Sequence, residues 1–151
     1  MGVTMTGDDP MTLYKTLLKA GNDDVEEILI MEGMRTYSRM RSEHDYTDRS
    51  GALTSSMGCV VSNGGNTKFV TGFDLAGSGT AGQDAGRRYA EQLAKEIQNG
   101  IIALIVLAGE DYGGYLESEN RDWKKGSPYK VVQFTEVDTR SNIEKQLEKL
   151  F

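Results

Sequence analysis

The sequence predicts an α+β fold in which a small antiparallel or mixed sheet of about four strands packs against two or three helices. Three observations support this fold class. Apolar residues recur every four positions over residues 81–98, which is typical of a helix with one buried face. Residues 101–107 are a continuous apolar run with β-branched members, which is typical of a central strand buried on both faces. Two strand-like runs, 58–62 and 67–73, flank a glycine- and asparagine-rich stretch at 63–66, which predicts a hairpin with a four-residue loop.

The chain has 151 residues, so we expect a single α+β domain over residues 1–151. Its apolar content of 38% and charged content of 26% are those of an ordinary globular protein. No apolar run approaches the roughly 18 residues that span a bilayer, so we expect no membrane partner.

The N-terminal third is predicted to be helical. Asp9 and Pro10 suit the start of a first helix, and Gly21 suits its end, which gives an N-terminal helical extension over residues 1–21. A second, longer helix should begin at residues 22–24, with acids in its first turn and arginines in its last turns. Its apolar residues, several of them methionine, spread over more than one face. We therefore expect this helix to be central in the domain or packed on a partner.

Residues 46–57 are predicted to form the turn that joins this long helix to the sheet. Asp48 or Ser50 can cap a short apolar turn, because a side-chain oxygen accepts from free backbone N–H groups at a helix start. Gly51 permits a sharp bend, and Leu53 should then point inward.

The C-terminal part is predicted to contain an exposed loop, a strand and a final helix. Residues 118–130 are polar and mixed in charge, which favours an exposed loop in which Trp123 could contact a partner. Residues 130–137 can form a strand. The last helix should start near Asp138 or Ser141, because Ser141 and Glu144 have the capping-box spacing.

The sequence gives no combination of residues that predicts catalysis, a bound metal or a cofactor. The net charge of −6 opposes tight nucleic-acid binding, which needs clustered cations. Cys59 lies in an apolar run, which indicates a buried, unreactive thiol. His44 is the single histidine and is surrounded by charged residues, so we expect it to be solvated. Neither a zinc site nor a serine–histidine triad has a second supporting element.

One glycine pattern leaves an enzymatic alternative open. Gly77, Gly79 and Gly82 match the G-x-G-x-x-G spacing of dinucleotide-binding loops, with a strand before them and a helix after them. The preceding strand is the second arm of a hairpin and is too polar for the centre of a parallel sheet, so we favour a flexible connection. A nucleotide-binding domain or small enzyme that uses the Gly77–Gly82 loop remains one alternative. A monomeric adaptor from a mobile element is another.

Two separate segments resemble one known family. The first is residues 46–53 followed by Ser56 and a strand, and the second is Ala108 and Gly109 followed by three spaced residues. Together they resemble two strings of the minor tail-component proteins of tailed bacteriophages and prophages. The matching positions are Tyr46, Asp48, Arg49, Gly51, Leu53, Ser56, Tyr112, Tyr115 and Glu117. The order of the elements between the strings is also similar, and the resemblance covers residues 27–117.

The resemblance implies a non-enzymatic tail-completion or head–tail joining protein that assembles as a ring, commonly hexameric. It implies that Asp48, Arg49, Gly51 and Leu53 form the helix-to-sheet junction, and that the second string forms the turn after the central strand. The implied partners are further copies of the chain and the phage connector or tail-tube proteins. The implied location is the host bacterial cytoplasm during assembly and then the virion. The chain departs from the family in its Gly113-Gly114 pair, in its longer loop at 118–129 and in its extra N-terminal helix.

Overall fold

A computed structural model describes residues 4–7, 12–19, 23–110 and 129–150 of the chain. In this part, five strands form one antiparallel sheet in the order β1-β2-β5-β3-β4. The strands are β1 (Thr4–Gly7), β2 (Thr12–Lys19), β3 (Met57–Asn63), β4 (Asn66–Gly72) and β5 (Ile101–Ala108). The predicted α+β class is confirmed, and the described sheet is antiparallel throughout, with one strand more than expected.

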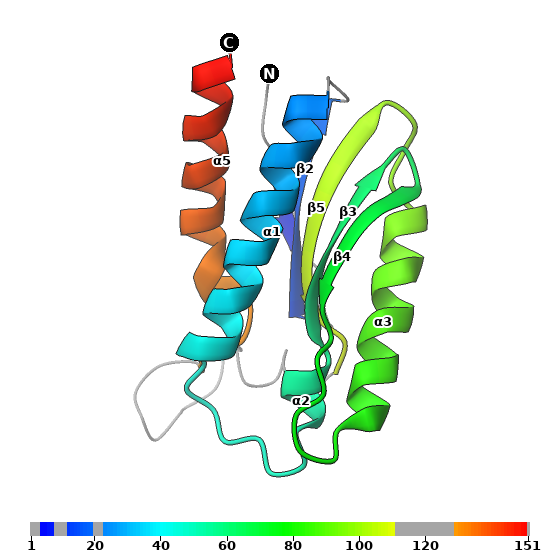
Figure 1. Cartoon of the computed structure of the whole chain (residues 1–151), viewed down its shortest axis with the longest axis vertical. Helices are drawn as coiled ribbons and strands as arrows, with labels where there is room; N and C mark the ends of the chain where they lie inside the picture. Colours follow the sequence, from blue (N-terminus) through cyan, green and yellow to red (C-terminus); the bar gives the residue numbers. More distant parts are fainter. Residues whose placement is uncertain (1–3, 8–11, 20–22, 111–128, 151) are drawn as a thin grey trace.

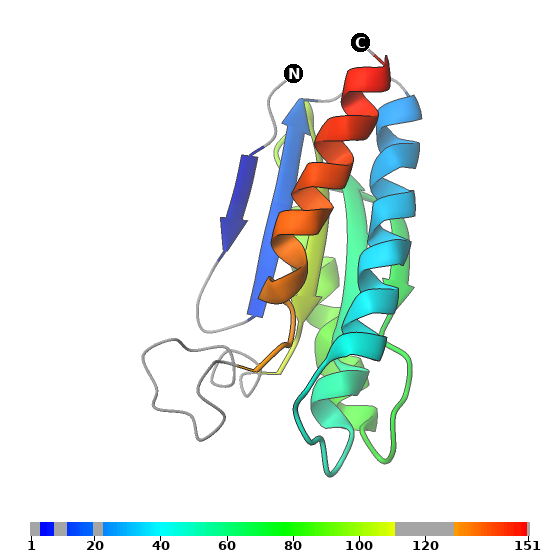
Figure 2. The same cartoon turned by 90° about the vertical axis from the view of Figure 1, so that its left-hand side faces the viewer.

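Helices cover both faces of this sheet (Figures 1 and 2). Helix α1 (Asp23–Glu43) and helix α5 (Glu136–Leu150) lie side by side on one face and run in opposite directions. Helix α3 (Thr80–Lys95) covers the other face. The short helix α2 (Ala52–Ser55) lies near the end of the sheet where β3 begins, and a 3-10 turn, η1 (Gln133–Thr135), leads into α5. No helix among the described residues combines the length and apolar character needed to cross a bilayer.

Strand β5 lies in the middle of the sheet, as the continuous apolar run predicted. Its side chains alternate between the two faces, because successive residues of a strand point in opposite directions. Ile102, Leu104 and Val106 belong to the core under α1 and α5. Ala103, Ile105 and Leu107 belong to the core under α3. One strand therefore supplies both apolar cores, which explains why it has no polar positions.

The predicted hairpin is β3 and β4. Asn63 pairs with Asn66, so the connecting loop is the two-residue turn Gly64-Gly65 instead of the four residues expected. Both glycines have positive φ, 59° and 93°, the combination that a tight hairpin turn of this kind requires. The hairpin places β4 at one edge of the described sheet.

The predicted N-terminal helical extension is wrong, because residues 4–7 form strand β1 and residues 12–19 form strand β2. This strand pairs along its whole length with β5, from Thr12 opposite Ala108 to Lys19 opposite Ile101. Leu13 packs on the α3 side, while Tyr14 and Leu18 pack on the α1 side. Leu13, Tyr14, Leu17 and Leu18 have a spacing that also fits one face of a helix, but here they are divided between the two faces of a sheet. The partner strand lies about ninety residues away in the sequence, where local periodicity cannot indicate it.

The predicted strand at 130–137 is also wrong. Val131 and Val132 are fully buried, but the chain then turns through η1 and enters α5 at Glu136. Both edges of the nearby strand β2 are already paired, with β1 and with β5, so that strand offers this segment no free edge. The final helix is confirmed, with a start slightly earlier than expected. Residues 118–128 of the predicted exposed loop lie outside the described residues.

Candidate functional site

The predicted helix-to-sheet turn is the centre of a structural unit, which we call the junction. The junction comprises residues 46–57 together with two segments that lie against them, residues 74–82 and 108–110. It contains every described residue that carries the family resemblance.

Asp48 holds the start of α2 through both of its carboxylate oxygens. Oδ2 accepts a hydrogen bond from the Thr54 amide at 2.7 Å, and Oδ1 accepts one from the Gly51 amide at 3.1 Å. Ser50 Oγ accepts from the Ala52 amide at 3.2 Å. The N-cap position of α2 is Gly51, which has no side chain, and the oxygens of both Asp48 and Ser50 accept from amides at the helix start, as predicted. The Asp48 carboxylate is thereby engaged with the backbone, which is a structural role.

Gly51 makes the bend, as predicted. Its φ of 82° lies in the left-handed region, and a Cβ built on it would fall 1.9 Å from the Ala76 carbonyl oxygen. Both facts require glycine, since any other side chain would be strained and would also collide with backbone. Leu53 is 3% exposed and packs in the core, which confirms its inward orientation.

Tyr46 anchors the junction from the helix side. Its hydroxyl lies 3.0 Å from Thr54 Oγ1 and 3.2 Å from Met57 Sδ, and all three side chains are buried. His44 stacks on the Tyr46 ring at a centroid distance of 4.3 Å. The prediction of a solvated histidine is therefore wrong in part, because His44 is half-buried and has an aromatic neighbour. Its Nδ1 is buried with no hydrogen-bond partner among the described residues.

Arg41 joins α1 to the junction. The acidic residues near it in the sequence, Glu43 and Asp45, gave no indication of this role. One of its guanidinium nitrogens donates to the Thr54 carbonyl at 3.2 Å and to the Asp74 carbonyl at 3.1 Å. Thr54 lies in the last turn of α2, where carbonyl groups lack helical partners and favour a cation. No short-range sequence signal marks this contact, because Arg41 and Asp74 are 33 residues apart.

The glycine-rich loop packs tightly against the junction instead of forming an open cradle. Ser55 Oγ accepts from the Ala76 amide at 2.8 Å, and the Ser78 amide donates to the Ser50 carbonyl at 3.0 Å. A Cβ on Gly82 would lie 2.0 Å from the Ala52 carbonyl oxygen, and one on Gly79 would lie 2.4 Å from that of Gly51. These glycines allow α3 to approach α2 closely. The space that a dinucleotide pyrophosphate would need at Gly79 and Gly82 is filled by backbone.

The start of the second family string lies beside the first. Met57 pairs with Ala108, and the Gly109 amide donates to the Ser56 carbonyl at 3.0 Å. Glu110 follows at the rim of the junction. Tyr112, Tyr115 and Glu117, and the possible partner contact Trp123, lie outside the described residues.

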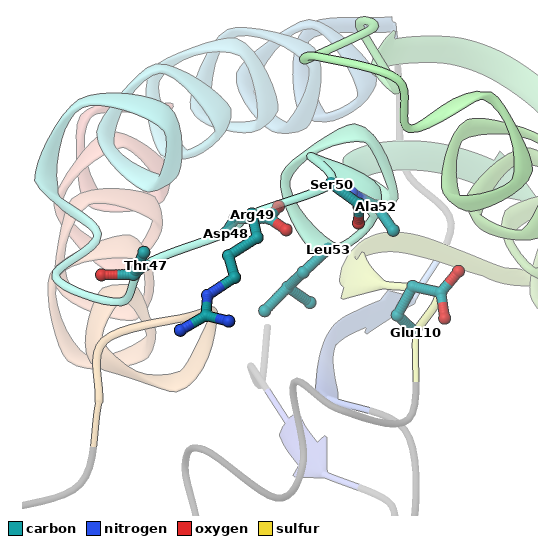
Figure 3. A pocket seen from close by; sticks show the side chains of 7 residues that line it. All are labelled: Thr47, Asp48, Arg49, Ser50, Ala52, Leu53 and Glu110. Carbon is teal, nitrogen blue, oxygen red and sulfur yellow. The ribbon is translucent and has the colours of Figure 1, made fainter.

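A hollow of about 590 Å³ opens at the junction (Figure 3). Its described lining consists of Thr47, Asp48, Arg49, Ser50, Ala52, Leu53 and Glu110. In the view of Figure 3, Arg49 and Glu110 lie on opposite sides of Leu53 and do not point toward each other. The described lining has no histidine, cysteine or lysine that could activate the Thr47 or Ser50 hydroxyl. Across the described residues, no group of three or more histidine, cysteine or acidic side chains is placed to hold a metal ion.

Cys59 is buried at 1% exposure, which confirms the prediction made for this thiol. Burial raises the pKa of Cys59 well above its ordinary value, because the thiolate would lose its hydration. It is therefore a poor nucleophile at neutral pH.

Comparisons with known proteins add no relative to this picture. No family model matches the chain, no curated protein matches it, and no solved structure matches its fold.

Proposed function

We propose that the protein is a non-enzymatic structural component of a tailed bacteriophage or prophage. In this role it joins the head connector to the tail, or completes the tail, as a ring of identical copies. One observation carries the proposal: segments some fifty residues apart, which resemble two strings of a single family, meet at one junction. Ser56 and Met57 from the first segment contact Gly109 and Ala108 from the second.

The chemistry of the junction supports a scaffolding role. The oxygens of Asp48, Ser50 and Ser55 bond to backbone groups of the turn and the glycine-rich loop. Side chains whose polar atoms are engaged in this way fix loop geometry and are not free for proton transfer. The junction is therefore suited to hold neighbouring loops rigidly for assembly.

The overall charge also supports this role. A net charge of −6 suits a ring through which DNA passes, because carboxylates and phosphates repel each other. A fluorescence binding assay at low salt checks this point, and we expect no tight binding of double-stranded DNA. Tight binding would argue against a DNA-conducting ring.

A deletion in the phage or prophage that carries the gene is the most direct test. We expect filled heads and separate tails that fail to join, seen by negative-stain microscopy, with infectivity restored from a plasmid copy. Particles with normally joined tails would overturn the proposal. In a second test, the purified protein is examined alone and mixed with the connector and tail-tube proteins of the same phage or prophage. We expect it to form rings on these neighbouring proteins in the mixture.

The nucleotide-binding alternative has a separate test. Binding of NAD or ATP to the native state would raise the unfolding temperature of the protein. We expect no shift with either nucleotide, because backbone of the junction occupies the space beside Gly79 and Gly82. A clear shift that is lost on substitution of the exposed Ser78 would favour this alternative over the structural role.

A further inference from the structure

Helix α1 presents two large apolar side chains to solvent at its middle. Met31 is 59% exposed and Met34 is 52% exposed, whereas the opposite side of the helix is buried against the sheet and α5. Figures 1 and 2 show α1 as an outer element, with the sheet behind it and α5 along one side. Adjacent exposed methionines on one helix are typical of a contact surface, because methionine adapts to the shape of a partner.

The exposed positions of α1 follow the spacing of a helix–helix seam. Asp24, Glu27, Met31, Met34 and Ser38 are all exposed and are separated by three, four, three and four residues. This alternation is the a/d pattern of two helices that pack along each other. The seam is apolar at its centre and polar at both ends, and α1 has 21 residues, or about 31 Å at 1.5 Å per residue.

Charge decides which helix fits this seam. The first five residues of α1, 23–27, carry four acids, and its last nine, 35–43, carry three arginines and one acid. Arg39 is already paired with Glu43 and Asp138, and the other two arginines also have partners within the chain. Arg41 has carbonyl partners, and Arg35 is 59% exposed with a 3.3 Å contact to Glu32. A parallel copy of α1 would set acids against acids, whereas an antiparallel copy sets acids against arginines.

We propose that α1 is a two-fold interface on which a second copy of this chain docks through its own α1, in antiparallel orientation. The axis passes between Met31 and Met34, so that each Met31 packs on the partner's Met34. In this register Glu27 of each copy lies opposite the partner's Ser38, and Asp24 lies opposite the partner's Arg41. The contact is self-complementary and closes at two copies. It does not depend on the phage role, since a ring needs a different, head-to-tail contact.

Sedimentation velocity on the full chain tests whether the pair exists. We expect a dimer whose dissociation constant rises about tenfold or more with Met34→Glu, because each substitution acts at both ends of the two-fold contact. The matched control is Val137→Glu on α5, which is 77% exposed and off the seam, and which should leave the dimer unchanged. Circular dichroism should show both variants folded. A wild-type chain that stays monomeric up to about 100 μM, or an assembly insensitive to Met34→Glu, overturns the proposal.

Introduced cysteines test the orientation. The native Cys59 is buried, so a new surface thiol would be the accessible one. Glu27→Cys and Ser38→Cys proteins are each treated with a short bis-maleimide, alone and as an equal mixture. The antiparallel register predicts cross-linked dimers in the mixture and little product from either protein alone. Efficient cross-linking of each protein by itself indicates a parallel pair, and no product in any sample indicates that α1 does not pair. Either result contradicts the proposal.

Discussion

The two faces of the sheet differ in the residues that pack between the sheet and its covering helices. Under α3 the core is built mainly from apolar side chains such as Leu13, Phe73 and Ile105, and the buried Ser62 Oγ donates to the Ala94 carbonyl of α3 at 2.7 Å. Under α1 and α5 an apolar core is crossed by buried hydroxyl and carboxyl groups. There Tyr14 Oη lies 2.8 Å from Thr135 Oγ1 and 3.0 Å from Thr139 Oγ1, and Thr139 Oγ1 lies 2.8 Å from Thr36 Oγ1.

The difference teaches which forces hold each layer. Close contact positions α3, because its glycines let it approach the junction and β3, and substitutions there should act through shape. Hydrogen bonds fix α5 against α1 and β2. Gln146 Nε2 of α5 donates to Glu32 Oε1 of α1 at 2.7 Å. Substitutions on this face should act through the satisfaction of polar groups, which is a smaller term for each contact.

The largest effect is expected at Phe73, on the α3 face. Its ring is fully buried and lies so close to Gly58 and Gly86 that a Cβ on either would come within 2.5 and 2.7 Å of it. Phe73→Ala would leave a cavity that this backbone cannot fill. We expect a loss of about 3–5 kcal/mol in the free energy of unfolding, measured by urea denaturation.

Phe69 provides the matched control for this change. Phe69 lies in strand β4, which Phe73 follows directly, but its side chain is half-buried and packs on the α1 side of the sheet. Phe69→Ala should cost clearly less than Phe73→Ala, because less apolar surface is withdrawn from the core. Equal losses for the two variants would show that the α3 face is not the more tightly packed one.

Substitution of one glycine in each helix by alanine tests the packing of α3 and α1 with a single added methyl group. In α3, a Cβ on Gly82 would lie 2.0 Å from the Ala52 carbonyl oxygen, an obstacle that cannot move without shifting α2. In α1, a Cβ on Gly33 would meet the Leu104 Cδ1 methyl at 3.1 Å, and that methyl can give way. We expect Gly82→Ala to lose about 2–3 kcal/mol in the free energy of unfolding.

Gly33→Ala should change the same quantity by less than about 1 kcal/mol, because the gain in helix propensity offsets the contact with Leu104. Thermal denaturation of both variants checks the pair. A Gly82→Ala protein as stable as Gly33→Ala would mean that α2 and α3 are not in close contact.

The contrast between the faces also explains what the sequence could predict. Helix α3 and strand β5 were predictable, because each has a periodicity that a local window contains. The turn at Asp48 and Gly51 was predictable because its hydrogen bonds connect residues at most six positions apart. Strand β2 was not, since Leu13 and Leu17 fit a helical spacing and the decisive partner, β5, is remote in sequence.

The close contact between the glycine-rich loop and the junction could not be predicted from the sequence either. Gly77, Gly79 and Gly82 suit a phosphate loop or a tight backbone contact, and only the position of Gly51 and Ala52 distinguishes the two. The contact of Arg41 with Thr54 and Asp74 needs the full fold for the same reason.

On the polar face, Tyr14→Phe should have a moderate effect. The change removes one hydroxyl and leaves Thr135 and Thr139 with fewer buried partners. Each threonine keeps another hydrogen bond, Thr135 to the Val132 carbonyl and Thr139 to Thr36. We therefore expect a loss of about 1–2 kcal/mol in the free energy of unfolding, by urea denaturation at pH 7.

The same variant should change the response to alkaline pH. Burial raises the pKa of Tyr14 above its ordinary value of 10, so the folded protein keeps this proton after the unfolded chain has lost it. The stabilising contribution is present below about pH 10 and falls as the pH rises further. Wild-type stability should therefore drop more steeply above pH 10 than that of Tyr14→Phe. Parallel curves for the two proteins would place Tyr14 outside the buried network.

The smallest expected effect is a gain, at Thr16 of the same face. This residue lies on β2 between Tyr14 and Leu18, is fully buried, and its Oγ1 has no hydrogen-bond partner among the described residues. Burying an unsatisfied hydroxyl costs free energy, and valine has nearly the same shape without it. Thr16→Val should therefore raise the free energy of unfolding by about 0.5–1.5 kcal/mol, measured by urea denaturation.

Thr139→Val is the matched control. The Thr139 hydroxyl is bonded to Tyr14 and Thr36, so this variant should lose stability. A loss in both variants would mean that Thr16 Oγ1 has a bonded partner in solution. Opposite signs would show that this face combines stabilising hydrogen bonds with an unpaired group.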